Sequence, residues 1–181
     1  NVVRLSEIKP SEEANRYALE LNKIPEKVEV ILSQSKRVVR AFKHPGQNEG
    51  TMICEHKLGF ISANAAVDES NSDFGTLVTL PDEPDVSAKR LGKSLEKRFG
   101  VTLGVVITDT FGRPWRLGQV NVAIGLYKVP NKISEVGTKD GWGRQLSVTE
   151  PAFSDEIAAA SGLVITKAAK TPLVVVRGAN W

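Results

Sequence analysis

The sequence predicts an α+β fold in which mixed, partly antiparallel sheets are packed against helices, as one domain or as two small lobes. Near the N-terminus, two short helical segments precede three short strand segments, which lie close enough along the chain to form an antiparallel meander. Further on, a long basic helix precedes the run from Val105 to Ile107, whose β-branched residues are typical of a strand covered on both faces. Helix and strand signals therefore alternate along the chain.

The composition indicates a folded chain with one substantial core. Its 181 residues include 41% apolar side chains, and 24 basic against 21 acidic residues give a net charge of +3. The charges are scattered, which argues against nucleic acid as the main partner. The one cysteine, Cys54, excludes an intrachain disulfide, and we expect it to be buried and inert in a reducing cytoplasm. No apolar stretch is long enough to span a bilayer, so no membrane partner is expected.

The first 80 residues carry two helix starts and four strand signals. Ser11 can cap a helix that runs to about Asn22, and Pro25 is a good first-turn residue for a second helix that runs to about Ser35. Short strands are expected at 38–42, 51–56, 58–63 and 77–80.

The second half is expected to hold two helices and four strands. Residues 85–99 predict a helix stopped by Gly100, with its apolar face formed by Val86, Leu91, Leu95 and Phe99. Its basic residues are interpreted as a solvated face: Lys89, Arg90, Lys93, Lys97 and Arg98. Strands are expected at 105–107, 119–123, 146–150 and 173–176, and a loop at 130–144. A helix is expected from Ser154 to about Ile165, with Asp155 and Glu156 serving its dipole.

The first candidate site follows the strand that begins at Val105. Gly112 and Pro114 mark where this strand should end, which would place Asp109 and Thr110 at its C-terminal end. A carboxylate beside a hydroxyl on rigid backbone can hold a hard divalent cation. The alternative is that the two residues only shape a turn.

The second candidate site is the stretch from Asn64 to Asn71. Small residues there lead into a cluster of oxygen-bearing side chains, and they would let backbone amides approach a ligand closely. Asp68 and Asn71 could present a carboxylate and an amide to one metal or phosphate. The alternative is a polar loop with Asx-type turns.

Five motifs, in this order and spacing, resemble the coenzyme F420-0:L-glutamate ligase family. They are Asn64 to Asn71, Gly104 to Arg113, Ala123 to Gly125, Asp155 to Ala158 and Val174 to Gly178. The resemblance implies an enzyme that uses GTP and a divalent metal, magnesium or manganese, to attach L-glutamate through an amide to coenzyme F420-0, with further gamma-linked glutamates to follow. It also implies an acyl-phosphate intermediate and no catalytic nucleophile, so that catalysis is mostly positioning and electrostatics.

The resemblance also assigns roles to individual residues. It implies metal ligands at Asp68, Asp109 and Thr110, and nucleotide contacts at Asn71, Thr166 and Lys167. Lys167 stands where many relatives carry a metal-binding side chain. A charged lysine can contact phosphate but cannot ligate a metal, which puts a second metal site in doubt.

The remaining expectations concern the substrate contacts, the oligomeric state and the alternative functions. Arg113 and Arg116 could meet the phosphodiester of the deazaflavin substrate. The resemblance implies a cytoplasmic homodimer and allows a monovalent cation beside the divalent one. Family members usually begin some tens of residues earlier, with a strand segment that touches the nucleotide, and we expect that segment to be missing here. Three alternatives stay open: a related ligase for another carboxylate acceptor, a catalytically silent nucleotide-binding module, and a nucleic-acid binder built on the basic helix.

Overall fold

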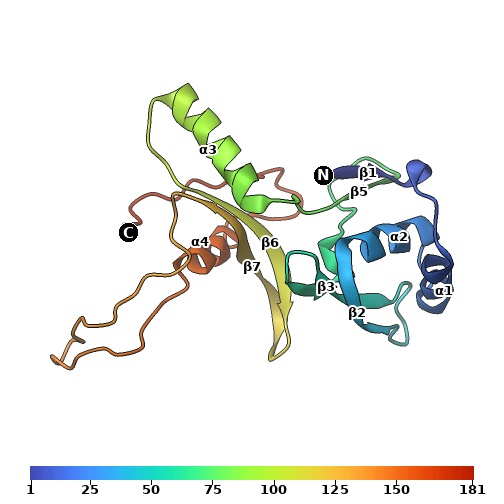
Figure 1. The fold of residues 1–181 in the computed structure, drawn as a ribbon, viewed down its shortest axis with the longest axis horizontal. Coiled ribbons are helices and arrows are strands. Elements are labelled where there is room, and N and C mark those ends of the chain that lie inside the picture. Colours follow the sequence, from blue (N-terminus) through green and yellow to red (C-terminus); the bar gives the residue numbers. More distant parts are fainter. The chain divides into compact units, whose positions relative to one another are not determined.

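The computed structural model describes every residue from Asn1 to Trp181 and divides into two compact units, residues 1–82 and 83–181. Each unit combines helices with strands (Figure 1). This confirms the predicted α+β class, and every pair of strands is antiparallel.

The first unit contains two helices and two small sheets. Helices α1 (Glu12–Leu21) and α2 (Pro25–Gln34) follow a strand, β1 (Val2–Arg4), and a 3-10 turn (Leu5–Glu7). Strands β2 (Ser35–Phe42), β3 (Thr51–His56) and β4 (Ile61–Ala63) form one sheet in that order, and β5 (Thr76–Val78) pairs with β1. Both predicted helices and the predicted meander are therefore present.

The signals that predicted the two helices also act as expected. The Ser11 hydroxyl accepts a hydrogen bond from the backbone N–H of Ala14 at 3.2 Å, which caps α1. Asn22 ends α1 in the left-handed conformation, with φ of 53°, and Pro25 opens α2. The chain therefore forms a helical hairpin within a residue or so of the predicted bounds.

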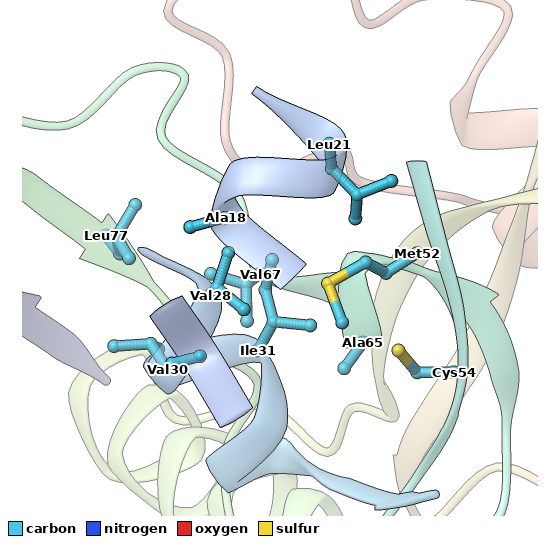
Figure 2. Packing of buried hydrophobic residues seen from close by; sticks show 11 residues of the cluster. Ala18, Leu21, Val28, Val30, Ile31, Met52, Cys54, Ala65, Val67 and Leu77 are labelled. Atoms are coloured by element: carbon cyan, nitrogen blue, oxygen red, sulfur yellow. The ribbon is translucent and has the colours of Figure 1, made fainter. Parts of the chain in front are cut away.

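The core of the first unit lies between the two helices and β3. Ile31 of α2 and Met52 of β3 are fully buried there, and Figure 2 shows their side chains beside Val67, which follows β4. Cys54 is fully buried as predicted, and burial raises the pKa of its thiol. Burial on this scale is the main force that stabilises the unit.

The second unit is organised around a two-stranded ribbon. Strands β6 (Val105–Arg113) and β7 (Arg116–Tyr127) form the ribbon, and helices α3 (Pro84–Phe99) and α4 (Phe153–Ser161) both pack on β7 (Figure 1). Residues 130–151 form an extended arm whose two limbs share backbone hydrogen bonds, such as that from Glu135 N–H to Thr149 O at 2.9 Å. No helix combines the length and apolar character that crossing a membrane would require.

The strand from Val105 ends at Arg113, between Gly112 and Pro114 as predicted, but the predicted place of Asp109 and Thr110 at its C-terminal end was wrong. β6 continues to Arg113, so Asp109 and Thr110 lie inside the strand and not at its C-terminal end. Gly112 fits the extended conformation with open space around it, and the chain reverses only after Arg113. The run at Val105 belongs to a two-stranded ribbon and is half-buried, instead of covered on both faces.

Two other predicted strands are absent. Residues 146–150 belong to the arm, where the nearest pairing is an isolated bridge between Lys139 and Gln145. Residues 173–176 pair with no strand, and Val175 is 66% exposed. A β-branched run forms a strand only where a partner completes its ladder of hydrogen bonds. Residues 173–176 pair with no strand, and residues 146–150 share only scattered hydrogen bonds with the opposite limb of the arm.

The predicted apolar face of α3 was also wrong. Val86, Leu91 and Phe99 are exposed, and the face that packs is formed by Ala88 and Gly92. The reason is a close approach, since a Cβ at Gly92 would lie 2.2 Å from the ring of Tyr127. Gly100 ends α3 in the left-handed conformation as predicted, whereas α4 ends at Ser161, short of the expected Ile165.

Candidate functional site

The second candidate site of the sequence, the stretch from Asn64 to Asn71, begins with three consecutive left-handed residues. Asn64, Ala65 and Ala66 have φ of 50°, 49° and 56°, a conformation that costs most side chains about 1–2 kcal/mol each. The Asn64 side chain accepts a hydrogen bond from Met52 N–H at 3.2 Å, and Ala65 is buried. Packing and this hydrogen bond hold the strained turn against β3. The small residues noted in the sequence are therefore needed by the fold at this point.

Asp68 is held firmly by the loop that follows. Its backbone exchanges two hydrogen bonds with Val78, of 3.0 and 2.7 Å, which extends the β1–β5 sheet. One carboxylate oxygen accepts from the N–H groups of Glu69 and Ser70, and the other accepts from the Ser70 hydroxyl at 2.5 Å. This is the Asx-type turn of the alternative interpretation. It also leaves an exposed carboxylate that is ordered before any ligand arrives.

Asn71 lies in the same exposed loop as Asp68. It adopts the left-handed conformation, with φ of 57°, which asparagine tolerates better than most residues. The structure thus brings the predicted metal ligand and the predicted nucleotide contact into one loop.

Asp109 and Thr110 lie opposite Val122 and Asn121 in the ribbon. Because side chains alternate along a strand, Asp109 and Thr110 leave the ribbon on opposite faces. A single ion could therefore be reached by both only at the outer edge of β6, which pairs with no further strand. The pair is less compact than its adjacency in the sequence suggested.

Asn121 is a neighbour of the candidate site that the sequence analysis missed. Thr110 donates its hydroxyl proton to the Asn121 side-chain oxygen at 2.8 Å, which keeps the Thr110 oxygen lone pairs available to a cation. The amide of Asn121 donates in turn to Ser161 at the end of α4, at 3.3 Å. Pairing the alternating residues of 119–123 with 108–112 would have identified this contact.

Asp155 stands in the first turn of α4, where the sequence placed it to serve the dipole. Its carboxylate also accepts a hydrogen bond from Ala123 N–H at 2.8 Å, so it fastens α4 to β7. This second contact was not predicted.

The two arginines stand at the turn of the ribbon, where they pair with each other across the strands. Arg113 bends back and donates to Leu117 O at 2.9 Å, so it braces the turn. Its Nε is buried with no partner. Arg116 is exposed. The structure therefore gives Arg113 a local role and leaves Arg116 open to solvent.

Thr166 and Lys167 follow α4 in an exposed segment. The Thr166 carbonyl accepts from Ala169 N–H at 3.1 Å, which forms a turn around Lys167. The structure gives this segment no helix or strand, so its predicted role rests on the sequence.

Lys27 is a second residue that the sequence analysis missed, and it lies beside the Asp68 loop. Its ammonium group is 3.0 Å from Glu49 and 3.0 Å from Glu69, the residue next to Asp68. Burial alone would lower the pKa of Lys27, but the hydrogen bonds to Glu49 and Glu69 outweigh it and raise the pKa. Burial likewise opposes the charge of Glu49, and its bonds to Lys23 and Lys27 hold its pKa below the usual value. A buried lysine has no sequence signal of its own.

Comparison with known proteins decides the family. The model of the family described as F420-0:Gamma-glutamyl ligase matches residues 1–178. The chain belongs to this family. It is 40% identical to the coenzyme F420:L-glutamate ligase of Methanothermobacter thermautotrophicus, over all of this chain and 70% of that protein. It is 42% identical to the enzyme of the same name from Methanopyrus kandleri, over 98% of this chain and 68% of that protein, and 40% identical to that of Methanocaldococcus jannaschii, over 99% and 70%.

The F420-0:gamma-glutamyl ligase match spans both units, so both candidate sites lie within it. The donors fit a hard cation better than a soft one. No three His, Cys, Asp or Glu side chains converge anywhere in the structure, and the candidate ligands are carboxylate, hydroxyl and amide oxygens. Such oxygens suit magnesium or manganese.

Proposed function

We propose that this chain is a GTP-dependent ligase that forms an amide between L-glutamate and coenzyme F420-0 and then adds further gamma-linked glutamates. The observation that carries the proposal is the family match over residues 1–178, together with relatives about 40% identical that are named coenzyme F420:L-glutamate ligase. Membership of the family supports gamma-glutamyl ligation in F420 biosynthesis. GTP as co-substrate and the order of the chemical steps are the further content of the proposal.

The proposed reaction has two steps. A carboxylate oxygen of F420-0 attacks the γ-phosphorus of GTP, the bond to GDP breaks, and an acyl phosphate forms. The amine of glutamate then attacks the acyl carbon, phosphate leaves, and the nitrogen releases its proton as the amide forms. Each step passes through a charged transition state, so positioning and charge neutralisation would supply most of the catalysis.

The proposed roles of the residues follow from their places in the two units. Asp68 in the first unit, and Asp109 and Thr110 in the second, are each proposed as ligands of divalent metal, which would neutralise triphosphate charge. Asn71, in the loop that holds Asp68, is a proposed nucleotide contact, and so are Thr166 and Lys167 in the segment after α4. Arg113 is committed to its own turn, so Arg116 is the better candidate for the phosphodiester of the substrate.

We also propose that the chain works as a homodimer. The second unit exposes Trp115 and Leu117 at the turn of its ribbon, by 77% and 96%, and its open strand edges could pair with a second copy. Light scattering with size-exclusion chromatography should give twice the chain mass. Leu117→Lys should shift the mass toward the monomer, while Leu163→Lys, which is equally exposed after α4, serves as the control.

Mass spectrometry tests the reaction. F420-0 incubated with the chain, GTP, L-glutamate and Mn²⁺ should gain one or more glutamyl units, and Asp68→Asn and Asp109→Asn should abolish the gain. Asp82→Asn, which changes an exposed carboxylate outside both candidate sites, should retain the gain of glutamyl units. With ¹⁸O in the substrate carboxylate, one ¹⁸O should appear in the released phosphate. Product formed without GTP, or phosphate without label, would contradict the mechanism.

A further inference from the structure

Two buried lysines of the first unit, Lys23 and Lys27, form an ion-pair network, but only one of them contacts the loop that holds Asp68. Lys23 and Lys27 both contact Glu49, at 2.9 and 3.0 Å, and their side chains are only 2% and 8% exposed. Only Lys27 extends further, to Glu69 at 3.0 Å. One lysine of the network therefore touches the candidate loop and the other does not.

The position of Lys27 makes it a rigid anchor. It lies in the first turn of α2, next to Val28, and both Val28 and Ile31 of that helix are fully buried in the core. A cation on so fixed a support can restrain a carboxylate more strongly than an exposed pair, in which both side chains must be ordered. Glu69 itself is 54% exposed and would otherwise move with solvent.

Restraining Glu69 restrains its neighbour. The N–H of Glu69 donates to the Asp68 carboxylate at 2.8 Å, and the Glu69 carbonyl accepts from the Ser72 hydroxyl at 3.0 Å. The orientation of the Glu69 peptide is therefore coupled to the orientation of the Asp68 carboxylate. An outer contact of this kind usually changes metal affinity by about 10–100-fold when it is lost.

We propose that Lys27 is a positioning residue that fixes the Asp68 carboxylate for a divalent cation by holding Glu69 against α2. The inference rests on the proposed function, because it takes Asp68 as a metal ligand. It adds a residue remote from the ligand, and it explains why a lysine is buried where an apolar side chain would fill the core.

The test compares Lys27→Met with Lys23→Met. Both variants remove one buried positive charge and one contact with Glu49, but only the first releases Glu69. Mn²⁺ binding is measured on the full chain without GTP, because GTP itself binds Mn²⁺, by the loss of the free-ion electron paramagnetic resonance signal. The half-saturating Mn²⁺ for glutamyl addition is measured alongside it. We expect Lys27→Met to weaken Mn²⁺ binding about tenfold or more. Lys23→Met should stay within about twofold of the parent chain, and Lys27→Arg should restore most of the affinity.

Glu69→Gln keeps the inference testable if Lys27→Met fails to fold, since Glu69 is half exposed. It should weaken Mn²⁺ binding in the same direction as Lys27→Met. Equal affinities in the two lysine variants would overturn the proposal. Tighter binding in Lys27→Met would also overturn it, because a lysine that acts only by its charge repels the cation.

The experiment can distinguish a failure of the role proposed for Lys27 from a failure of the proposed metal site. If Asp68→Asn binds Mn²⁺ as the parent chain does, then Asp68 is not a ligand, and the proposed metal site fails with the inference. If Asp68→Asn loses binding while Lys27→Met and Lys23→Met behave alike, then the metal site stands and only the role of Lys27 is wrong.

Discussion

The two units of the chain are stabilised by different means. In the first unit, helices α1 and α2 bury a continuous set of apolar side chains against β3, including Leu21, Ile31 and Met52. In the second unit the buried apolar side chains are small, those of Pro84, Ala88 and Ala158. The second unit therefore cannot depend on hydrophobic burial to the same extent.

The second unit uses close backbone contact and helix carboxylates instead. Asp85 of α3 accepts from Leu126 N–H at 2.7 Å, and Asp155 of α4 accepts from Ala123 N–H at 2.8 Å, so each helix grips the backbone of β7. Gly125 allows α3 to approach further, because a Cβ there would lie 2.6 Å from the Pro84 backbone. Such contacts demand exact fit and tolerate little added volume.

This difference places the candidate ligands on unlike supports. Asp68 follows a turn locked into an apolar core, whereas Thr110 depends on a chain of polar contacts through Asn121. Substitutions that leave a cavity should lower the stability of the first unit more than that of the second. Substitutions that add volume or remove a hydrogen bond should lower the stability of the second unit more. The chain offers separate probes, since Cys54 lies in the first unit and Trp115, Trp142 and Trp181 lie in the second.

The largest effect is expected from Ile31→Ala. Removing a fully buried isoleucine leaves a cavity and should lower the free energy of unfolding of the first unit by about 2–5 kcal/mol. Urea titration followed by the reactivity of the Cys54 thiol should show this loss. Val175→Ala, at a 66% exposed position, should change stability by less than about 0.5 kcal/mol. Similar losses in the two variants would contradict the claim that burial of Ile31 stabilises the first unit.

The sequence predicted the first unit well because its signals are local. The cap at Ser11, the proline at Pro25 and the short alternating strands each act on neighbouring residues. Local signals also located Gly100 at the end of α3. The α+β class followed from these elements without any knowledge of how they pack.

The sequence failed where a partner decides the outcome. Nothing local to residues 173–176 shows that no strand pairs with them, and nothing local to Val86 or Leu91 shows that α3 packs through Ala88 and Gly92. Asp109 and Thr110 were placed at the end of their strand, although β6 goes on pairing with β7 as far as Arg113. Packing and pairing between distant segments override local preference.

The candidate site residues likewise fall into those that the sequence could identify and those that only the structure reveals. The motifs around Asp68 and Asp109 were visible in the sequence, and the family that they suggested is confirmed. Asn121 and Lys27 were not visible, because their roles depend on strand register and on a buried ion pair. The roles of the named ligands remain predictions until metal and nucleotide binding are measured.

After Ile31→Ala, the next largest loss of stability is expected from Gly125→Ala in the second unit. The added methyl group meets the Pro84 backbone, which cannot rotate away as a side chain could, and the variant should lose about 1–3 kcal/mol. Fluorescence of the three tryptophans should report this loss, since the ring of Trp181 lies 5.5 Å from that of Phe153 on α4. Gly141→Ala is the control, because no atom lies within 4 Å of its new Cβ. An unshifted tryptophan transition in Gly125→Ala would show that α3 does not need its close approach.

A smaller effect is expected from Asn121→Leu. The variant removes the acceptor for the Thr110 hydroxyl, which then turns its proton toward the proposed cation. We expect the half-saturating Mn²⁺ for glutamyl addition to rise about tenfold. Ser161→Ala removes only the far end of the chain of contacts, so it should change this value much less. An equal rise in both variants would indicate a general loosening of α4 instead of an effect on Thr110.

The smallest effect is a dependence on pH that belongs to the first unit alone, because both histidines of the chain lie there. Burial lowers the pKa of His56, and the charges of Lys57 and Lys36 lower it further. Its Nδ1 accepts from Leu58 N–H at 3.0 Å, and protonation would break that bond. As pH falls below about 6.5, the unfolded chain takes up the proton before the folded chain does, so stability falls.

The fall is expected to begin as the pH drops below about 7, with a slope of at most about 1.4 kcal/mol per pH unit for a single group. The reactivity of the Cys54 thiol, measured with a disulfide reagent that reacts in weak acid, should report this loss of stability in the first unit. The unfolding transition seen by tryptophan fluorescence should not shift over the same pH range. His56→Gln should remove the slope, because its amide oxygen can still accept from Leu58 N–H without titrating. His44→Gln, at an exposed position, should keep the slope. A slope of equal size in the tryptophan transition would mean that the two units unfold together, since the second unit has no histidine to generate it.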